Sequence, residues 1–279
     1  MRILSFDTTN NCVSIALLDG ENVVGERLFV SSGTQRQESV TLLLPAVDEM
    51  LEQAGWRKST LDLLVVGIGP GSFTGIRIAV VTARTLAQAL NLPLAGVSLL
   101  DCYAAKIAEA ENDLAEFSII LSGGRGHFYF SAYEKECLAE SAENSTVTAS
   151  MREMVTPQHG TLPDMKIALS CSKNWFVDSS LLESLASTNG IVLKELPELV
   201  NIAKFQGVLA HRRVSLRKSA GTDSLDSSSL SEENVPGVLN GIAKESLLNE
   251  YPYRIVEPLY LRGASVTLKG SDGKATAVN

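Results

Sequence analysis

Histidine and cysteine are scarce in this 279-residue chain, which holds three of the former and four of the latter. No two histidines have the H-x-x-x-H spacing of a helical zinc or iron site. The cysteines include no C-x-x-C pair, so they are expected to be reduced thiols in a cytosolic protein. Cys171 and His159 could be imagined as a nucleophile and its base, but nothing local activates either one. The sequence therefore predicts no catalytic group and no metal site.

Long apolar runs and an excess of positive charge are also missing. No stretch of about eighteen apolar residues occurs, so no membrane span is expected. The formal charge of -8 argues against a broad nucleic-acid-binding surface on the chain itself. Residues 1–7 reach an acidic residue after few apolar ones, which indicates a buried strand rather than a signal peptide. We therefore expect a cytoplasmic globular protein, long enough for one large domain or two smaller ones.

The first part of the chain alternates between strand and helix patterns in a recognisable order. Apolar periodicity and turn residues predict helices over 38–54, about 76–90 and 98–111. The same signals predict strands over 3–6, 12–18, 22–30, 61–68 and 94–97. The order β-β-β-α-β-α-β-α is typical of a ribonuclease-H-like half domain, over residues 1–112.

The second part is less regular. We expect a hairpin from 117–121 and 127–133, further strands over 166–171, 191–196 and 259–261, and a helix over 201–217. A serine-rich segment near 215–235 should be a mobile loop, and residues 263–279 a disordered tail. With residues 113–262 as a second half, the chain fits an α/β, actin-like (ASKHA) fold. Such a fold has two half domains with mixed sheets flanked by helices.

A glycine-rich loop joins the fourth expected strand to the second helix. Gly69, Pro70, Gly71, Ser72, Phe73, Thr74 and Gly75 form it. Its backbone amides could cradle an anion or grip a neighbouring backbone. The loop is neither a dinucleotide fingerprint nor a P-loop, since it lacks the glycine spacing of the one and the Gly-Lys-Ser/Thr ending of the other.

A short polar corner, Asp7, Thr8 and Thr9, follows the first strand. In a half domain of this kind such a carboxylate can hold a hydrated metal ion while the hydroxyls meet a phosphate. Alternatively, the three side chains cap a tight turn through local hydrogen bonds. The second interpretation is favoured, because no second carboxylate accompanies Asp7 in a motif and Mg²⁺ usually needs several oxygen ligands.

The helix after the glycine loop is apolar in nearly every direction, and Arg77 and Arg84 are its only charges. Such a helix must be covered on more than its sheet-facing side. It is either buried inside one large domain or covered by another subunit, and small residues that allow close helix approach favour the subunit. The expected interface residues are Leu43, Val47, Arg77, Val80, Ala83 and Arg84.

Several of these pieces together resemble the TsaB (YeaZ) family of bacterial threonylcarbamoyladenosine synthesis. They are residues 3–9, the helix around Leu43-Leu44-Pro45, the GPGSFTGIRIA block at 69–79, residues 94–98 and residues 257–262. The resemblance is strong over residues 1–105 and patchy beyond. The glycine block in this setting is shared by TsaB and its catalytic paralogue TsaD.

What distinguishes the two paralogues is a pair of histidines. Proteins like TsaD carry a metal-binding H-x-x-x-H after the fifth strand, where this chain has residues 101–106, D-C-Y-A-A-K. The resemblance therefore implies a non-catalytic subunit that pairs with TsaD and supports threonylcarbamoyl transfer to adenosine 37 of ANN-decoding tRNAs. It also implies the ATPase TsaE as a further partner, contact with tRNA only through the complex, and homodimers when TsaD is absent. ATP or ADP with Mg could bind at or near a subunit junction, with Asp7, Thr8 and Thr9 as the expected contacts.

The sequence departs from the family in its second half. An Asp-Ala-Arg-like turn is replaced by Ser122-Gly123-Gly124-Arg125-Gly126, and the chain is longer than a typical member. Other functions therefore stay open: an independent ATPase, a glycoprotease-type peptidase, or a homodimeric scaffold.

Overall fold

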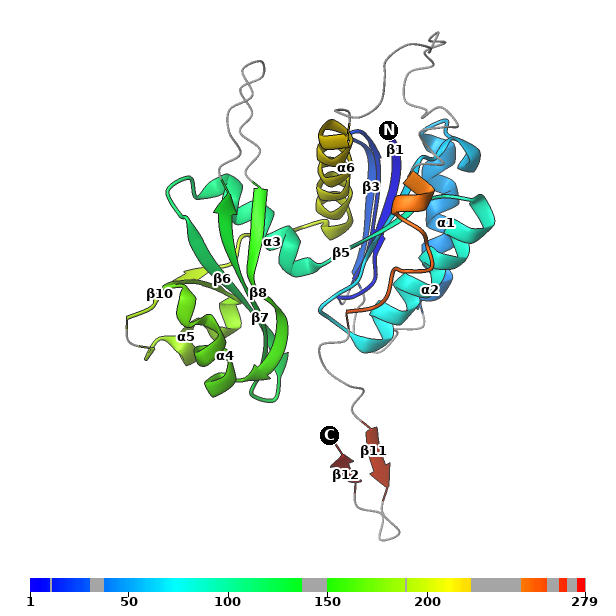
Figure 1. Cartoon of the computed structure of the whole chain (residues 1–279). Helices are drawn as coiled ribbons and strands as arrows, with labels where there is room; N and C mark the ends of the chain where they lie inside the picture. Colours follow the sequence, from blue (N-terminus) through cyan, green and yellow to red (C-terminus); the bar gives the residue numbers. More distant parts are fainter. Residues whose placement is uncertain are drawn as a thin grey trace. The chain divides into compact units, whose positions relative to one another are not determined.

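The computed structural model describes residues 1–10, 12–30, 38–136, 150–188, 190–221, 247–259, 266–269 and 275–278. The chain divides into two units (Figure 1). The first unit comprises Met1–Ile107 and Pro197–Leu259, and the second comprises Ala108–Leu196 and Tyr260–Asn279. The first boundary lies close to the expected one at 112. The expected second half, 113–262, differs from the second unit because residues 197–259 return to the first unit.

A five-stranded mixed sheet forms the centre of the first unit, in the order β3-β2-β1-β4-β5. Its strands are β1 (Arg2–Asp7), β2 (Cys12–Asp19), β3 (Asn22–Val30), β4 (Leu63–Gly67) and β5 (Leu94–Val97). The first three pair antiparallel, whereas β1, β4 and β5 run parallel. All five residues of β4 are buried, as expected of a strand covered on both faces. These pairings confirm the predicted order of elements.

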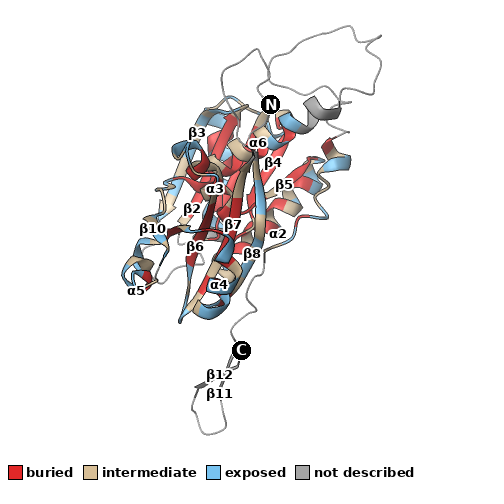
Figure 2. Ribbon diagram, turned by 60° about the vertical axis from the view of Figure 1, so that its left-hand side comes forward, coloured by how far each residue is buried: buried red, intermediate tan, exposed pale blue. Residues whose placement is uncertain are grey.

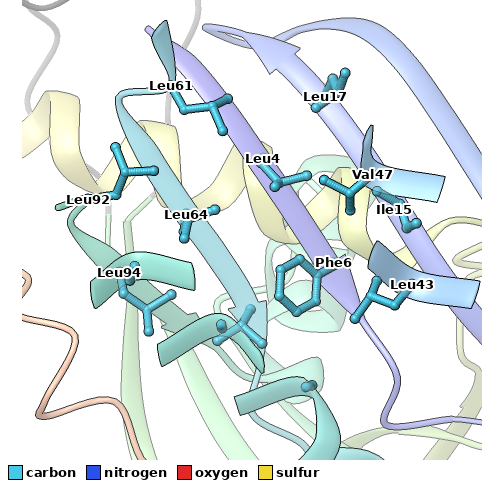
Figure 3. Close-up of a cluster of buried hydrophobic side chains, with 14 of the residues drawn as sticks. Leu4, Phe6, Ile15, Leu17, Leu43, Val47, Leu61, Leu64, Leu92 and Leu94 are labelled. Atoms are coloured by element: carbon cyan, nitrogen blue, oxygen red, sulfur yellow. The ribbon is translucent and has the colours of Figure 1, made fainter. Parts of the chain in front are cut away.

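Helices cover both faces of this sheet (Figure 1). On one face, α1 (Glu38–Gln53) and α2 (Phe73–Leu90) pack on Leu4 and Phe6 of β1, and the close-up in Figure 3 shows these side chains with Leu43 and Val47 of α1. On the other face, α6 (Ile202–Gly221) packs on Ile3 and its neighbours. The alternating side chains of β1 thus supply two cores, one on each face.

The ends of the helices follow from local residues. Helix α2 begins at Phe73, three residues earlier than predicted, because the Ser72 hydroxyl accepts a hydrogen bond from the Gly75 amide. It ends at Asn91, whose φ of 50° is left-handed. Helix α3 (Leu99–Ala110) begins at the Ser98 cap, whose hydroxyl accepts from the Leu100 amide at 3.1 Å.

Helix α6 belongs to the first unit although it lies far along the chain. Ala203, Ala210 and Val214 form its buried stripe, at the spacing of one helix face. A Cβ at Gly207 would come within 2.5 Å of Leu18, so glycine lets this helix approach the sheet closely. The helix continues to Gly221, which contradicts the mobile loop expected from residue 215. Residues 222–235 of that expected loop lie outside the described residues.

The second unit is built on another five-stranded mixed sheet, in the order β10-β9-β6-β7-β8. Its strands are β6 (Glu116–Gly124), β7 (His127–Glu136), β8 (Ser150–Thr161), β9 (Asn174–Val177) and β10 (Val192–Glu195). Short helices α4 (Leu162–Ala168) and α5 (Leu182–Leu185) pack on it around Trp175, which is 1% exposed. In Figure 2 the ribbon of the central strands is coloured as buried in both sheets. The β6–β7 hairpin and β10 were predicted, whereas β8 and β9 were not.

The strand predicted over 166–171 is wrong. This segment is the end of α4 and a 3-10 turn, Leu169–Cys171. The helix forms because the Asp164 carboxylate accepts from both the amide and the hydroxyl of Thr161, which closes a capping box.

The end of the chain also differs from expectation. Where a disordered tail was predicted, β11 (Val266–Lys269) pairs antiparallel with β12 (Ala275–Val278). In the predicted last strand, the Leu259 amide donates to the Ile68 carbonyl, and residues 260 and 261 lie outside the described residues. No helix in the described parts of the chain has the length and apolar character needed to cross a membrane.

Candidate functional site

The Asp7-Thr8-Thr9 corner lies at the carboxyl end of β1, inside the first unit. All three residues are buried: Asp7 is 1% exposed, Thr8 3% and Thr9 0%. In a parallel βα arrangement, ligands usually bind at this end of the strands. The corner is therefore the first place to look for a site, but its side chains do not face solvent.

Both carboxylate oxygens of Asp7 are engaged by the protein. The amide and the hydroxyl of Thr9 each donate to Oδ1 at 2.7 Å. The side-chain amide of Gln206, on α6, donates to Oδ2 at 2.6 Å. The bonds from Thr9 cap the turn after β1, and the bond from Gln206 connects this turn to α6.

Burial raises the pKa of Asp7 above its usual value. The hydrogen bonds from Thr9 and Gln206 act in the opposite direction, because they stabilise the charged form. The net effect is an upward shift, so removal from water outweighs the three hydrogen bonds. A buried carboxylate of this kind depends on its donors.

The glycine loop grips the same corner from the other side. The Thr8 hydroxyl donates to the Gly75 carbonyl at 2.7 Å, and the Ser72 amide donates to the Thr9 carbonyl at 2.6 Å. A Cβ at Gly75 would overlap the Thr8 carbonyl oxygen, and one at Gly71 would overlap that of Thr9. Of the two roles expected for this loop, the structure shows contact with a neighbouring backbone.

The corner does not fit a metal-bound nucleotide held through Asp7. A metal ion would need a carboxylate oxygen that already accepts from Thr9 or Gln206, and Thr8 uses its hydroxyl on Gly75. Among the described residues, no group of three or more histidine, cysteine, aspartate or glutamate side chains could hold a metal ion. Nucleotide binding at this corner stays a prediction, and the arrangement gives it no open ligand.

The predicted interface residues separate into two groups. Leu43, Val47, Val80 and Ala83 are buried, at 1%, 3%, 1% and 0% exposure. Leu43, Val47 and Ala83 pack in the core between the helices and the sheet, so they do not present a surface to a partner. Arg77 is exposed, with its guanidinium 4.2 Å from the centre of the Phe73 ring, and Arg84 is half-buried.

The same two helices carry exposed aliphatic side chains that are not among the predicted interface residues. Val81 of α2 is 63% exposed, and Leu42 and Leu44 of α1 are 39% and 44% exposed. The buried side of α1 also includes Ala46 and Met50. The interface itself stays a prediction, now with different residues to carry it.

Two residues of the corner were missed by sequence reasoning. Gln206 is the one strongly polar side chain on the buried face of α6, which was the available signal. Gly67, at the end of β4, leaves room for Asp7, since a Cβ there would overlap the carboxylate. Neither is close to Asp7 in the sequence, so only the fold brings the three together.

Comparison with protein families supports a specific relationship. Residues 33–170 match the family model "TsaD: tRNA N6-adenosine threonylcarbamoyltransferase". The chain is 35% identical over 134 residues to the Bacillus subtilis tRNA threonylcarbamoyladenosine biosynthesis protein TsaB, covering 48% of this chain and 56% of that protein. It is 34% identical over 137 residues to the Escherichia coli TsaB protein, covering 49% of this chain and 56% of that one. The chain thus spans about half the length of these curated relatives.

Solved structures extend the similarity over most of the fold. A Pseudomonas aeruginosa protein described as similar to the peptidase YeaZ superposes with a TM-score of 0.60 at 20% identity, over 94% of this chain and 99% of that one. YeaZ from the same organism gives 0.55 at 24%, over 79% and 93%. The fold is therefore α/β and actin-like (ASKHA), with two mixed sheets flanked by helices, as predicted. The chain is thus similar to proteins of the TsaB (YeaZ) family over about half of their length, and its residues 33–170 are similar to TsaD.

Proposed function

We propose that this chain is a non-catalytic subunit that binds TsaD and thereby supports transfer of a threonylcarbamoyl group to adenosine 37 of ANN-decoding tRNAs. TsaD would carry the catalysis. TsaE would join the complex, and tRNA would be contacted through it. The names of the relatives, tRNA threonylcarbamoyladenosine biosynthesis proteins, support the pathway.

The observation that carries the proposal is the exposure of three large aliphatic side chains on α1 and α2. Val81, Leu42 and Leu44 stand in solvent on two helices that share one face of the sheet. A large aliphatic side chain that stays exposed on a helix, as Val81 does at 63%, is a candidate contact for a protein partner. Arg77, held against Phe73, adds a positive charge to the same helix.

The polar corner supports an accessory role in a different way. Asp7 is 1% exposed, and both of its carboxylate oxygens accept hydrogen bonds from this chain. The loop beside it binds the corner rather than a ligand. Both features support the view that this part of the chain fixes the position of α2.

A binding and transfer experiment tests the proposal. TsaD and TsaE, with ATP, threonylcarbamoyl-adenylate-forming components and tRNA, are assayed with and without this chain, and binding to TsaD is measured by titration. We expect transfer only when both TsaD and this chain are present. Transfer by this chain alone, or unchanged transfer by TsaD without it, would contradict the proposal.

Val81→Asp locates the surface, with Val24→Asp as its matched control. Val24 lies on β3 and is 45% exposed, so both changes place the same charge at an exposed valine. We expect Val81→Asp to weaken TsaD binding at least about tenfold, because a central apolar contact would lose its packing and gain an unpaired charge. Val24→Asp should leave binding unchanged. The reverse pattern would move the interface to β3.

A homodimer through the same surface is the second candidate, since the aliphatic side chains fit a second copy of the chain as well as a paralogue. Light scattering of the isolated protein distinguishes the two. A dimer that Val81→Asp dissociates and that TsaD replaces would place both partners on one surface.

A further inference from the structure

A cavity of about 490 Å³ lies at the edge of the first sheet, beside β5. Its walls come from β5, from Ala210 and Arg213 of α6, and from residues 255–259. All of these residues belong to the first unit. The cavity is not lined by Asp7, Thr8 or Thr9 and has no part in the proposed interface, so neither of these features explains it.

Residues 251–259, which we term the strap, run along this edge and are drawn in orange in Figure 1. The strap is fastened at both ends. The Leu94 amide donates to the Tyr251 carbonyl at 3.0 Å, and the Leu259 amide donates to the Ile68 carbonyl at 2.9 Å. Between these bonds only Val256 is buried, whereas Ile255 is 67% exposed. The strap therefore arches over the edge of β5 and leaves the cavity beneath it.

The edge of β5 presents a peptide group toward this side. Bonds from the amides of Leu64 and Ile68 to the carbonyls of Pro93 and Val97 show that odd-numbered residues of this segment face β4. The alternation of a parallel ladder then points the N–H and C=O of Gly96 away from β4, toward the strap. Among the described residues of the strap, none forms a backbone hydrogen bond with Gly96.

The remaining walls are mostly aliphatic, and the charge in them is balanced. Ile68, Val97 and Ala210 supply apolar surface. The guanidinium of Arg213 pairs with the Asp101 carboxylate at 2.8 Å, so it does not bring an uncompensated positive charge. Glu257 is exposed, at the rim. A charged ligand would lose its hydration on entering the cavity and would find no unpaired opposite charge there to compensate for that loss.

We infer that this cavity binds a small, neutral, largely apolar molecule that carries a primary amide group, whose oxygen and one N–H point to the same side. The amide oxygen accepts from the Gly96 N–H, the amide N–H donates to the Gly96 C=O, and the apolar part packs on the aliphatic walls. The volume is within the usual range for small-molecule sites. A continuous strand of another protein does not fit, because the strap closes the edge at Leu94 and at Ile68.

The test uses the 279-residue chain labelled with ¹⁵N and titrated with N-acetyl-leucinamide, a neutral molecule with a terminal primary amide and one branched apolar group. We expect the amide signal of Gly96 to shift and to saturate. N-acetyl-leucine, the same molecule with a carboxylate in place of the terminal amide, should bind at least tenfold more weakly. A carboxylate that binds as well as the neutral amide would overturn the inferred ligand class.

Ile255→Asp and its matched control Ile167→Asp test the location. Both isoleucines are exposed, Ile255 at the cavity and Ile167 on α4 of the second unit, at 76%. Ile255→Asp should weaken binding at least tenfold, and Ile167→Asp should have no effect. If the strap amides of Ile255→Asp shift before any probe is added, Ala210→Leu, which fills the cavity from α6, serves as the second variant and should abolish saturation.

Three results would overturn the inference. The first is no saturable shift of Gly96 up to the solubility limit of the probe. The second is saturation confined to signals outside β5, α6 and the strap. The third is binding that neither Ile255→Asp nor Ala210→Leu weakens. Because none of these measurements involves TsaD, they leave the proposed function untouched.

Discussion

Gln206 donates a hydrogen bond to the carboxylate of Asp7 across 199 positions of sequence, at 2.6 Å. Both side chains are at least 99% buried, and the bond joins the end of β1 to the N-terminal part of α6. The other side-chain atom of the amide, Oε1 of Gln206, is buried with no hydrogen-bond partner. Among the described residues, the only hydrogen bond of this side-chain amide is therefore the one to the Asp7 carboxylate. The free energy of unfolding should then depend on this bond and on the pH at which Asp7 titrates.

The first prediction is that Gln206→Leu destabilises the protein more at pH 7.5 than at pH 4.5. Burial raises the pKa of Asp7, so the folded protein keeps a proton that the unfolded chain has released, and stability falls as pH rises through that window. The bond from Gln206 lowers this pKa, so its removal extends the window upward. We expect a loss of roughly 1–3 kcal/mol at pH 7.5, measured by urea unfolding.

Two controls accompany this measurement. Gln88→Leu makes the same change at an exposed position of α2 and should alter stability little at either pH. Asp7→Asn removes the titrating group, so Gln206→Leu in that background should lose its pH dependence. Equal effects of Gln206→Leu at both pH values would show that the bond does not act on a charged Asp7.

The second prediction concerns the glycine loop. Gly75→Ala should destabilise the protein by about 1–3 kcal/mol, because the new Cβ would overlap the Thr8 carbonyl oxygen and force the loop away from the corner. Gly25→Ala is the matched control, since its Cβ would meet only Met50 at 3.7 Å, an ordinary contact. Thermal unfolding compares the two. A tolerated Gly75→Ala would show that the loop is not held on the corner.

The third prediction uses two adjacent valines of α2. Val80→Asp should cost at least about 3 kcal/mol, because Val80 is 1% exposed and its charge would be buried without a partner. Val81→Asp should change stability by no more than about 0.5 kcal/mol, since Val81 is 63% exposed. Denaturant unfolding of the two variants checks this. Similar losses for both would mean that α2 is covered on its outer side within the chain.

The sequence predicted the first sheet well because its signals are local. Apolar runs, Ser72, Asn91 and Gly55 act within a few residues of the elements they define, and β1 to β5 and α1 to α3 lie close to their predicted bounds. The second sheet was predicted less well. Strand β8 is mostly polar along its length, and β9 has only four residues, so neither has a clear period.

The polar corner and the interface were harder for a different reason. Apolar periodicity shows that α2 has a buried side, but it cannot show how wide that side is. Val80 and Ala83 were therefore assigned to a partner, although both are buried within this chain, at 1% and 0% exposure. No local sequence pattern predicts the Asp7–Gln206 bond. Helix α6 packs on the first sheet, although in the sequence it follows all five strands of the second sheet.

The last prediction uses the alkylation of two cysteines to follow the unfolding of the first unit. Cys102 is 2% exposed, and burial raises its pKa well above the usual range, so its thiolate is scarce and out of reach. Cys171, in the second unit, is exposed. With iodoacetamide at pH 8, Cys171 should be alkylated in the folded protein. Cys102 should be alkylated only at denaturant concentrations that unfold the first unit, as followed by peptide mass spectrometry.

A variant of α6 tests the same point. Because Cys102 packs in the same core as Ala203 and Ala210 of α6, Gly207→Ala should lower the denaturant concentration at which Cys102 is labelled. Early labelling of Cys102 in the unaltered protein would mean that α6 leaves the sheet before the unit unfolds.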